Sequence, residues 1–448
     1  MEVSYMANQY DYDVLYLGSG HGTFDGAIPL VQSGAKVGVV EADMIGGTCP
    51  NYGCNAKITL DAPVALSREV ERLAGVVDGK LTINWAKNVA HKNDVIKGLP
   101  GMIGGLLDSV GIDVFHGKGS FQDAHTIVVD GQEKTADKIV VSTGLRPHRL
   151  DIPGTELAHD SREFMDLTEL PKNIAIIGSG YISMEFATIA NAAGANVTVL
   201  MHSDKALRSF YQPYVEQVIA DLEDRGVKFI KNANVSAFVR NGDQFDVEYG
   251  DDDKLTVDWI LDATGRIPNV EDIGLEKVGV KYNAHGVIVD DHLQTSVENI
   301  YASGDVIDKT QPKLTPTAVF ESTYLCKLFS GQTSDAIQYP VIPSVVFTSP
   351  RIAKAGVSVE DAEKQGLTVQ TNHLPDDWYR QVDNETQGDD TLIFDKDHHL
   401  VGVTEVSEQA DNVINTLLPA MEFKFGAAEL GRLVYLFPSI SSATWGQL

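Results

Sequence analysis

Short apolar runs alternate with glycine turns and helical patterns along the first half of the chain. The run DVLYL at 13–17 is followed by GSGHGT, by a helical pattern over 24–32 and by a second apolar run over 36–40 that ends in Glu41. Strand, tight turn, helix and strand in this order predict a βαβ unit that binds a dinucleotide. The same order recurs from Asn173 in NIAIIGSGYISMEFATIANAAGANVTVLM. Two such units predict two nucleotide sites in one polypeptide, which excludes the simplest dehydrogenases with a single unit.

Later apolar runs complete this pattern and then change in character. KIVVSTGLRP at 138–147 and WILDATGRIP at 259–268 are each predicted to close one unit. Asp305 follows Gly304 at the end of a further strand. From about Tyr339, prolines punctuate β-rich stretches that precede a helical run. The chain is therefore predicted to have an α/β fold, with two Rossmann-like dinucleotide-binding domains followed by a C-terminal α+β domain.

The first glycine turn has the residues that a pyrophosphate requires. Gly18 and Gly20 carry no Cβ, so the backbone can approach the phosphates at the positive end of a helix. Thr23 stands where a third glycine is usual, which predicts somewhat looser packing of the helix on the strand. Glu41 ends the next strand, where its carboxylate can accept hydrogen bonds from ribose hydroxyls. A single glycine turn is often purely structural, but this one has the strand, the helix and the acid at the expected spacing.

The second glycine turn repeats the first with a different residue set around it. Gly178 and Gly180 fill the same two positions. The second strand ends without the acid that an NAD site usually carries, and His202, Lys205 and Arg208 follow it. Basic side chains there favour a 2′-phosphate, so we expect NADPH, with NADH as the other possibility. The alternative interpretation of these three residues is an ordinary solvated turn.

The segment GGTCPNYGCNAK places Cys49 and Cys54 at the start of a predicted helix. Five residues of regular helix rise roughly 7.5 Å, beyond the Cα separation of about 6.8 Å at which a disulfide closes. The first turn must therefore be distorted, and Pro50 and Gly53 suit that distortion. A helix N-terminus also stabilises a thiolate, so we expect a redox-active pair. The alternatives are two inert thiols or a zinc half-site, and zinc is disfavoured because Cys326 stands alone in an apolar stretch.

Composition narrows the class of protein. The 448 residues are 43% hydrophobic and 22% charged, with a mean hydropathy of -0.09, which is typical of a globular protein of two or three domains. A formal net charge of -28 argues against nucleic acid as a partner, since binding phosphates needs Lys and Arg. No apolar run approaches the roughly eighteen residues of a membrane span, and the N-terminus lacks the character of a signal peptide. We therefore expect a cytoplasmic protein without a membrane partner.

Taken in order, the segments GSGHGT, GGTCPNYGCNAK, GSGYISMEF, ATGRIPN, YASGDV and LTPTA resemble the motifs of the pyridine nucleotide-disulfide oxidoreductases, the group of glutathione reductase, dihydrolipoamide dehydrogenase and mercuric reductase. The resemblance spans nearly the whole chain. It implies FAD in the first unit, with Asp305 near the ribityl and phosphate region, and a nicotinamide nucleotide in the second, with Tyr181 gating its pocket. Lys57 and Glu185 match the ion pair near the flavin N5. The resemblance also assigns cofactor contacts to Gly47, Thr48, Lys57, Thr143, Gly144, Ile182, Gly265, Gly304, Leu314, Thr315 and Ala318.

The reaction implied by the resemblance passes a hydride from NAD(P)H to the flavin and then an electron pair to Cys54, while Cys49 meets the substrate. Near the C-terminus the family usually has a His-Pro segment that brings an acid/base to the disulfide of the other subunit. This chain has YLFPSISSATW, with Phe437 at the histidine position and Ser442 at that of its Glu partner. Neither residue holds a proton near neutral pH. Mercuric reductases also have Phe-Pro, but they end in a cysteine pair, and this chain ends in WGQL.

The resemblance implies a homodimer and three domains, namely an FAD-binding domain (10–153 and 285–338), an NAD(P)-binding domain (154–284) and a dimerisation domain (339–448). The first predicted function is an FAD-dependent NAD(P)H:disulfide oxidoreductase of glutathione-reductase type that acts on a small disulfide. Because the C-terminal histidine is missing, the second is a flavoprotein that reduces metal ions, quinones or oxygen. A flavin-bearing redox sensor without activity is the third, and the intact cysteine pair argues against it.

Overall fold

The computed structural model describes residues 9–448, and their contacts divide them into two compact units. Unit 1 comprises the residues up to 57, Lys92–Pro147 and Arg266–Tyr339, and unit 2 comprises Ile58–His91, His148–Gly265 and Pro340–Leu448. Both units are therefore assembled from segments that lie far apart in the sequence. The boundaries of the three domains inferred from the resemblance stay a prediction.

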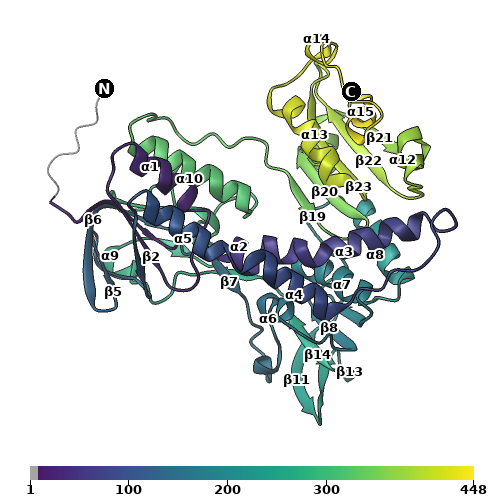
Figure 1. Ribbon diagram of the computed structural model, residues 1–448, viewed down its shortest axis with the longest axis horizontal. Coiled ribbons are helices and arrows are strands. Elements are labelled where there is room, and N and C mark those ends of the chain that lie inside the picture. Colours follow the sequence, from purple (N-terminus) through teal and green to yellow (C-terminus); the bar gives the residue numbers. More distant parts are fainter. Residues whose placement is uncertain (1–8) are drawn as a thin grey trace. The chain divides into compact units, whose positions relative to one another are not determined.

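The first predicted βαβ unit lies in the main sheet of unit 1 (Figure 1). The strands run in the order β3 (Asp113–His116), β2 (Val37–Glu41), β1 (Tyr12–Leu17), β6 (Gln132–Val141), β5 (Thr126–Val129) and β4 (Ser120–Asp123), and β18 (Ile300–Ala302) also pairs with β6. The β1, β2, β3, β6 and β18 strands are parallel, whereas β4 and β5 are antiparallel. Every residue of β1 and β2 is buried. Burial on both faces explains why these strands are continuous apolar runs in the sequence.

Helices α1 (Phe24–Gln32) and α10 (Thr315–Phe329) lie side by side in unit 1 (Figure 1). A Cβ on Gly26 would lie 2.0 Å from the carbonyl oxygen of Ser322, so the two backbones meet where only glycine fits. Cys326 is buried in α10, as predicted. Unit 1 also contains α2 (Thr48–Tyr52), the start of α3 (Cys54–Arg72), the end of α4 (Trp85–Ile96), α5 (Leu99–Ser109), α9 (Leu275–Val278), the 3-10 turn η2 (Gly304–Val306), and the paired strands β7 (Leu145–Pro147) with β15 (Arg266–Pro268) and β16 (Tyr282–Asn283) with β17 (Gly286–Val287).

The second predicted βαβ unit forms a four-stranded parallel sheet in unit 2. The strands run in the order β10 (Lys228–Ile230), β9 (Asn196–Leu200), β8 (Asn173–Ile177) and β14 (Trp259–Asp262). An antiparallel sheet of β11 (Val235–Asn241), β12 (Gln244–Tyr249) and β13 (Asp253–Val257) shares an apolar core with it, and the helical segments are η1 (Thr155–Leu157), α6 (Ser161–Met165), α7 (Tyr181–Ala192) and α8 (Gln212–Asp224). As predicted, β6 and β14 each close one βαβ unit by parallel pairing with its first strand.

The C-terminal part of unit 2 is an antiparallel sheet packed against helix α13 (Ala410–Glu422). Its strands run in the order β19 (Ser344–Val346), β20 (Arg351–Gly356), β23 (Leu400–Ser407), β22 (Asp389–Phe394) and β21 (Thr368–His373). Val413 and Leu417 of α13 share an apolar cluster with Val403 of β23. The remaining helical segments are α11 (Val359–Gln365), η3 (Leu374–Asp376), α12 (Trp378–Val382), α14 (Ala427–Leu430) and α15 (Ile440–Trp445). The predicted α+β character of this region is confirmed.

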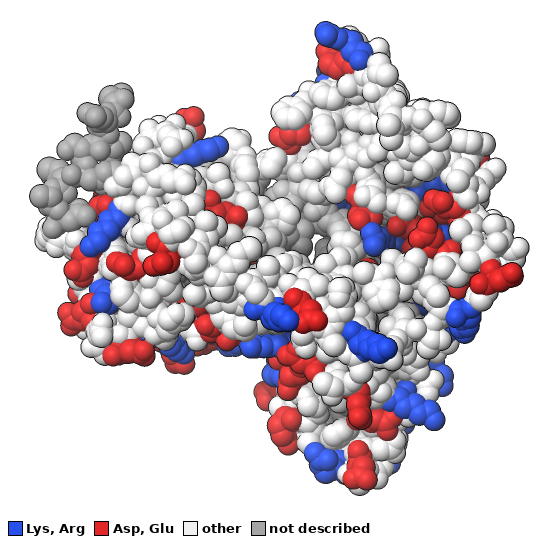
Figure 2. Space-filling model, viewed as in Figure 1, with Lys and Arg blue, Asp and Glu red and all other residues white. Residues whose placement is uncertain are grey.

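Charged side chains are spread over the surface. On the face drawn in Figure 2, acidic and basic side chains are interspersed, as expected of a solvated surface. Among residues 9–448, no helix combines the length and the apolarity that crossing a bilayer requires.

Replacing Glu271 by Gln is expected to reduce the loss of thermal stability at acid pH. Arg146 donates two hydrogen bonds of 2.7 and 2.8 Å to the Glu271 carboxylate, and these lower its pKa to about 2. Because the pKa is lowered on folding, the pair stabilises the protein above the unfolded value of about 4.3, and this stability is lost as the pH falls through the folded value. Melting temperatures between pH 5 and pH 2 should therefore fall less steeply in E271Q, and R146Q should have the same effect. The pair is largely exposed, so the effect is small.

Candidate functional site

The first glycine turn is closed against the end of β6. Gly18 has φ +105°, and a Cβ on it would lie 2.4 Å from the carbonyl oxygen of Ser142. Thr23 is fully buried, and its hydroxyl donates a 2.8 Å hydrogen bond to the carbonyl oxygen of Gly18. The threonine thus fills the space of the usual third glycine and ties the helix to the turn, and the looser packing of helix on strand stays a prediction.

Glu41 is held beside this turn by a network that the sequence did not predict. The Ser19 N–H and hydroxyl donate to Glu41 Oε2 at 2.9 and 2.5 Å, and the Asp43 N–H donates to Oε1 at 2.8 Å. The Ser19 hydroxyl in turn accepts from the Gly46 N–H at 2.9 Å. A carboxylate has about four acceptor sites, so one remains for a ribose hydroxyl.

The space beside the first turn fits a dinucleotide. A Cβ on Gly20 would meet no atom closer than 3.8 Å, and a Cβ on Gly144 would meet none within 4 Å. Gly47 lies against Gly20, where its own Cβ would be 3.0 Å from the Gly20 Cα. The glycines of the turn and the start of helix α1 suit the phosphates of FAD, and the Glu41 carboxylate, with one acceptor site left, suits its ribose.

The other predicted FAD contacts lie in the same unit. Asp305 lies in η2, and both backbone groups of the preceding Gly304 are fixed, because its N–H donates to Glu321 at 2.7 Å and its carbonyl accepts from Lys309 at 3.1 Å. Glu321 and Lys309 form a buried ion pair of 2.6 Å that no motif in the sequence indicated. The remaining predicted contacts occupy the start of α2 (Gly47, Thr48), the turn after β6 (Thr143, Gly144), the start of α10 (Leu314, Thr315, Ala318) and the first turns of α3 (Lys57).

The two cysteines lie on either side of a break in the helix. Cys49 is in α2, Cys54 begins α3, and Gly53 between them has φ -133° and ψ -118°. A Cβ on Gly53 would lie 2.8 Å from the carbonyl oxygen of Thr48, so the break requires glycine. The predicted distortion is confirmed. The Asn51 amide, which we did not single out, donates to the carbonyl oxygens before α2 and holds the chain there.

Both cysteines are thiols in the structure, and the two side chains interact strongly. Cys54 is exposed and Cys49 is half-buried, and the Thr315 hydroxyl lies 3.5 Å from the Cys54 Sγ. The hydrogen bond to Cys54 and then burial raise the pKa of Cys49 far above its ordinary value, whereas Thr315 lowers it. The reduced pair therefore loses its first proton more readily than its second, because one thiolate is stabilised by the remaining thiol.

Replacing Cys54 by Ala is expected to speed alkylation of Cys49 at pH 8. The change removes the hydrogen bond that raises the pKa of Cys49, so a larger fraction is thiolate, which is the form that reacts. Site-resolved mass spectrometry of the reduced protein after timed iodoacetamide treatment measures the rate. Thr315→Val should have the opposite effect, since its hydroxyl favours the thiolate. Equal Cys49 rates in the wild type and both variants would contradict this account.

The second glycine turn repeats the geometry of the first in unit 2. Gly178 has φ +112°, and a Cβ on it would lie 2.5 Å from the carbonyl oxygen of Ala263. The Ser183 hydroxyl donates a 2.6 Å bond to the carbonyl oxygen of Gly178, as Thr23 does in the first turn. A Cβ on Gly180 or Gly265 would meet no atom within 4 Å, and Ile182 lies in the first turn of α7. This open helix start also suits a dinucleotide.

The loop after β9 presents the predicted basic residues to solvent. His202, Lys205 and Arg208 are all exposed, and so is Asp204, the acid nearest the strand end. The strand itself ends at Leu200 and is followed by buried Met201, so no carboxylate occupies the position that binds a ribose 2′-hydroxyl in NAD sites. The arrangement is compatible with a 2′-phosphate.

Tyr181 and Glu185 lie on successive turns of α7. The Tyr181 ring packs edge-on against Phe210, with centroids 5.7 Å apart. Glu185 is buried and accepts a 3.0 Å hydrogen bond from the backbone N–H of Phe347. Lys57 belongs to unit 1 and Glu185 to unit 2, and their predicted ion pair stays a prediction.

The residues at the predicted acid/base positions have structural contacts. Phe437 is 73% exposed and stacks on Trp378, with centroids 5.9 Å apart. The Ser442 hydroxyl donates to the carbonyl oxygen of Ser439 and takes part in the cap of α15. Neither group can supply a proton to a leaving thiolate near neutral pH.

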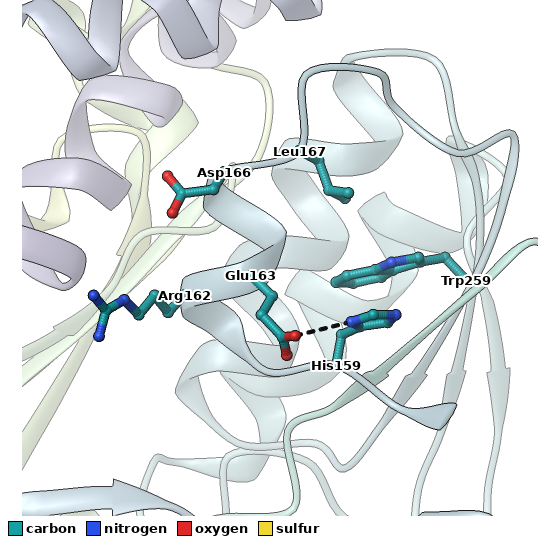
Figure 3. Close-up of a pocket in the computed structure, with 6 residues that line it drawn as sticks. All are labelled: His159, Arg162, Glu163, Asp166, Leu167 and Trp259. Carbon is teal, nitrogen blue, oxygen red and sulfur yellow. Dashed lines mark hydrogen bonds and ion pairs between the residues drawn. The ribbon is translucent and has the colours of Figure 1, made fainter. Parts of the chain in front are cut away.

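A separate open cavity of about 370 Å³ lies beside α6 in unit 2 (Figure 3). His159 stacks on Trp259 with ring centroids 4.6 Å apart, and its Nδ1 lies 3.2 Å from Glu163 Oε1. Figure 3 shows Arg162 pointing away from this pair. None of the six described residues that line the cavity was predicted to bind cofactor or substrate, and we give the cavity no part in the reaction.

Comparison with known proteins shows the family to which the chain belongs. The family profile "Pyridine nucleotide-disulphide oxidoreductase" matches residues 12–322, and the profile of the dimerisation domain of the same family matches residues 342–447. The chain is 32% identical over 429 residues to a mercuric reductase of Staphylococcus aureus, covering 92% of this chain and 77% of that protein. It is 35% identical over 374 residues to the chloroplastic/mitochondrial glutathione reductase of Pisum sativum, covering 80% of this chain and 67% of that protein.

Among solved structures, the HOCl-induced flavoprotein disulfide reductase RclA from Escherichia coli matches with a TM-score of 0.88 and 26% identity, covering 98% of this chain and 99% of that one. The fold and the sequence similarity agree over nearly the full length. The chain therefore belongs to the pyridine nucleotide-disulphide oxidoreductase family and is an oxidoreductase of its FAD-dependent, nicotinamide-nucleotide-linked class.

Proposed function

We propose that this enzyme uses NADPH to reduce a small disulfide through Cys49 and Cys54, with the balance NADPH + H⁺ + RSSR giving NADP⁺ + 2 RSH. The observation that carries the proposal is the cysteine pair itself. The two thiols interact across the helix break at Gly53, and the Cys54 Sγ is 3.5 Å from the Thr315 hydroxyl. Two sulfur atoms held this closely can form and break a bond with little movement of the backbone.

The first turn, with Gly18, Gly20, Glu41 and Asp305, would hold FAD. When bound, FAD supplies the two-electron carrier between the nicotinamide and the disulfide. In unit 2, the turn at Gly178 would hold the nucleotide phosphates. His202 and Arg208 would contact the 2′-phosphate.

The proton held by the cysteine pair can protonate the leaving thiolate, so this step does not need the missing C-terminal histidine. A reduced pair keeps a proton on Cys49 because the hydrogen bond to Cys54 raises the Cys49 pKa. When the proton of the pair passes to Cys54, the Cys49 thiolate attacks RSSR, a Cys49–SR bond forms, the RS–SR bond breaks, and the leaving RS⁻ takes the proton from Cys54. The Cys54 thiolate then attacks the mixed disulfide, the Cys49–Cys54 bond forms, and the second RS⁻ leaves and takes a proton from water.

A second candidate function is the reduction of a metal ion, a quinone or oxygen. Phe437 favours it, because these acceptors do not require a proton donor for a leaving thiolate. The solved relative RclA has also been determined as a Cu(II) complex, with a TM-score of 0.87 to this chain.

NADPH oxidation by the purified flavoprotein separates the two candidates. The panel should contain glutathione disulfide and other small disulfides, Cu(II), Hg(II), a quinone and oxygen. We expect turnover with at least one disulfide, lost in Cys49→Ser, and a higher kcat/KM with NADPH than with NADH. Turnover with metal ions or quinones alone would favour the second candidate. Absence of disulfide turnover would overturn the first.

We also propose that the enzyme is a cytoplasmic homodimer. Support for the dimer comes from the match to the dimerisation domain over residues 342–447 and from exposed apolar side chains at the same end of the chain. Val434 is 97% exposed and Leu436 is 81% exposed, next to Phe437. Apolar side chains exposed to this degree suit a surface that is covered in an assembly. Analytical ultracentrifugation that finds an active monomer would contradict the dimer.

A further inference from the structure

The loop after β9, residues 201–211, is anchored by its buried side chains. Leu207 and Phe210 are almost fully buried. The Leu207 N–H donates a 2.9 Å hydrogen bond to the carbonyl oxygen of Ser179 in the second glycine turn. Leu207 also has φ +42°, in the left-handed region that a leucine seldom adopts. The conformation of this loop must therefore be held by its surroundings.

Part of what holds the loop is Tyr181, the predicted nicotinamide gate. Phe210 packs edge-on against the Tyr181 ring at 5.7 Å with an interplanar angle of 70°. Burial raises the pKa of Tyr181, and the side chain of the neighbouring Ser209 opposes this. The loop that carries the basic residues and the tyrosine are therefore in direct contact through the two rings.

Two paired strands of the C-terminal sheet, β19 and β20, also contact the loop of 201–211 and the helix of Tyr181. Ser344 of β19 is the register partner of Lys354 of β20. The β19 strand lies against α7, the helix that begins at Tyr181. The Lys354 Nζ lies 5.0 Å from the Phe210 ring centroid and donates to the carbonyl oxygen of Ser209. The β19–β20 pair therefore contacts both the loop of 201–211 and the helix that Tyr181 begins.

We propose that Lys354 and Phe210 are positioning residues that set the preference for NADPH, by holding the loop of 201–211 and Tyr181 as one assembly. The inference rests on the proposed NADPH site. Ser209 follows Arg208 directly, so the carbonyl group that Lys354 holds fixes the backbone that carries Arg208. Only NADPH has a 2′-phosphate for Arg208 to bind. Loss of Lys354 should consequently weaken NADPH binding much more than NADH binding.

Lys354→Met tests this proposal, because methionine keeps an unbranched apolar stem and removes the charge and the donor. We expect the KM for NADPH to rise about tenfold, the scale of one charged hydrogen bond with a cation–π contact. The kcat and the KM for NADH should change less than twofold. Lys354→Arg should restore most of the NADPH affinity, and Phe210→Leu should reproduce the K354M effect in part. Lys364→Met is the control, since Lys364 is 73% exposed and pairs locally with Asp361.

A measurement made without nucleotide tests the role of Lys354 separately from the proposal that NADPH is the nucleotide used. Backbone hydrogen exchange of residues 203–210 should be faster in K354M than in the wild type and in K364M. If the wild type preferred NADH, the NADPH proposal would be wrong, and faster exchange would still support the positioning by Lys354. An equal rise in KM for both nucleotides, or unchanged KM together with unchanged exchange, would overturn the inference.

Discussion

Replacing Cys54 by Ser is expected to lower NADPH-driven disulfide reduction by roughly a thousandfold or more, because Cys49 alone can form the mixed disulfide but has no second thiol to resolve it. The flavin should stay bound, since none of the contacts around Gly18 and Glu41 involves Cys54. Absorbance of the purified variant near the flavin maximum measures retention of FAD. Steady-state oxidation of NADPH with the best disulfide of the panel measures the loss of turnover.

Cys326→Ala is the matched control for the C54S variant. Cys326 is buried in α10 among the apolar side chains of the core, and it is far from Cys49 and Cys54 in the sequence. Its replacement should therefore lower stability somewhat and leave turnover close to that of the wild type. Oxygen or a quinone as acceptor gives a second comparison, because their reduction needs no disulfide exchange. If C54S kept its turnover with disulfides, the assignment of the cysteine pair to catalysis would be wrong.

The features that were predicted from the sequence are set by residues close together along the chain. Both βαβ units follow from apolar runs that belong to strands buried on both faces, and the helix break follows from the five-residue spacing of Cys49 and Cys54. The distortion at Gly53 could be predicted because regular helix geometry forbids the disulfide.

The features that were missed depend on contacts between distant segments. Cys54 and Thr315 are 261 residues apart, and no local pattern shows that the hydroxyl would lie beside the sulfur. Lys354 has no motif around it, and its importance appears only when β20 and the loop at Phe210 are seen in contact. The hydrogen bond from the Thr23 hydroxyl to the Gly18 carbonyl oxygen was also missed, because the missing glycine alone does not show where a threonine hydroxyl would donate.

Gly18→Ala and Gly178→Ala should show which turn binds FAD and which binds NADPH. Each substitution introduces the same kind of clash, but in only one of the two turns. Gly18 has φ +105° and Gly178 has φ +112°, and the added Cβ would lie 2.4 or 2.5 Å from a carbonyl oxygen of the adjacent strand end. Alanine in this conformation costs about 1–2 kcal/mol before the clash is counted. The turn must therefore move in each variant, and the phosphate cradle moves with it.

We expect G18A to lose most of its flavin and G178A to keep it while its KM for NADPH rises about tenfold or more, because only the second turn would contact the nucleotide phosphates. Flavin per polypeptide and steady-state kinetics measure the two effects. Gly101→Ala in α5 is the control. Its Cβ would meet no atom within 4 Å, and alanine should stabilise that helix by about 0.5–1 kcal/mol. If G18A retained full flavin, or if G178A lost flavin while its KM stayed unchanged, the assignment of FAD to the first turn and NADPH to the second would be wrong.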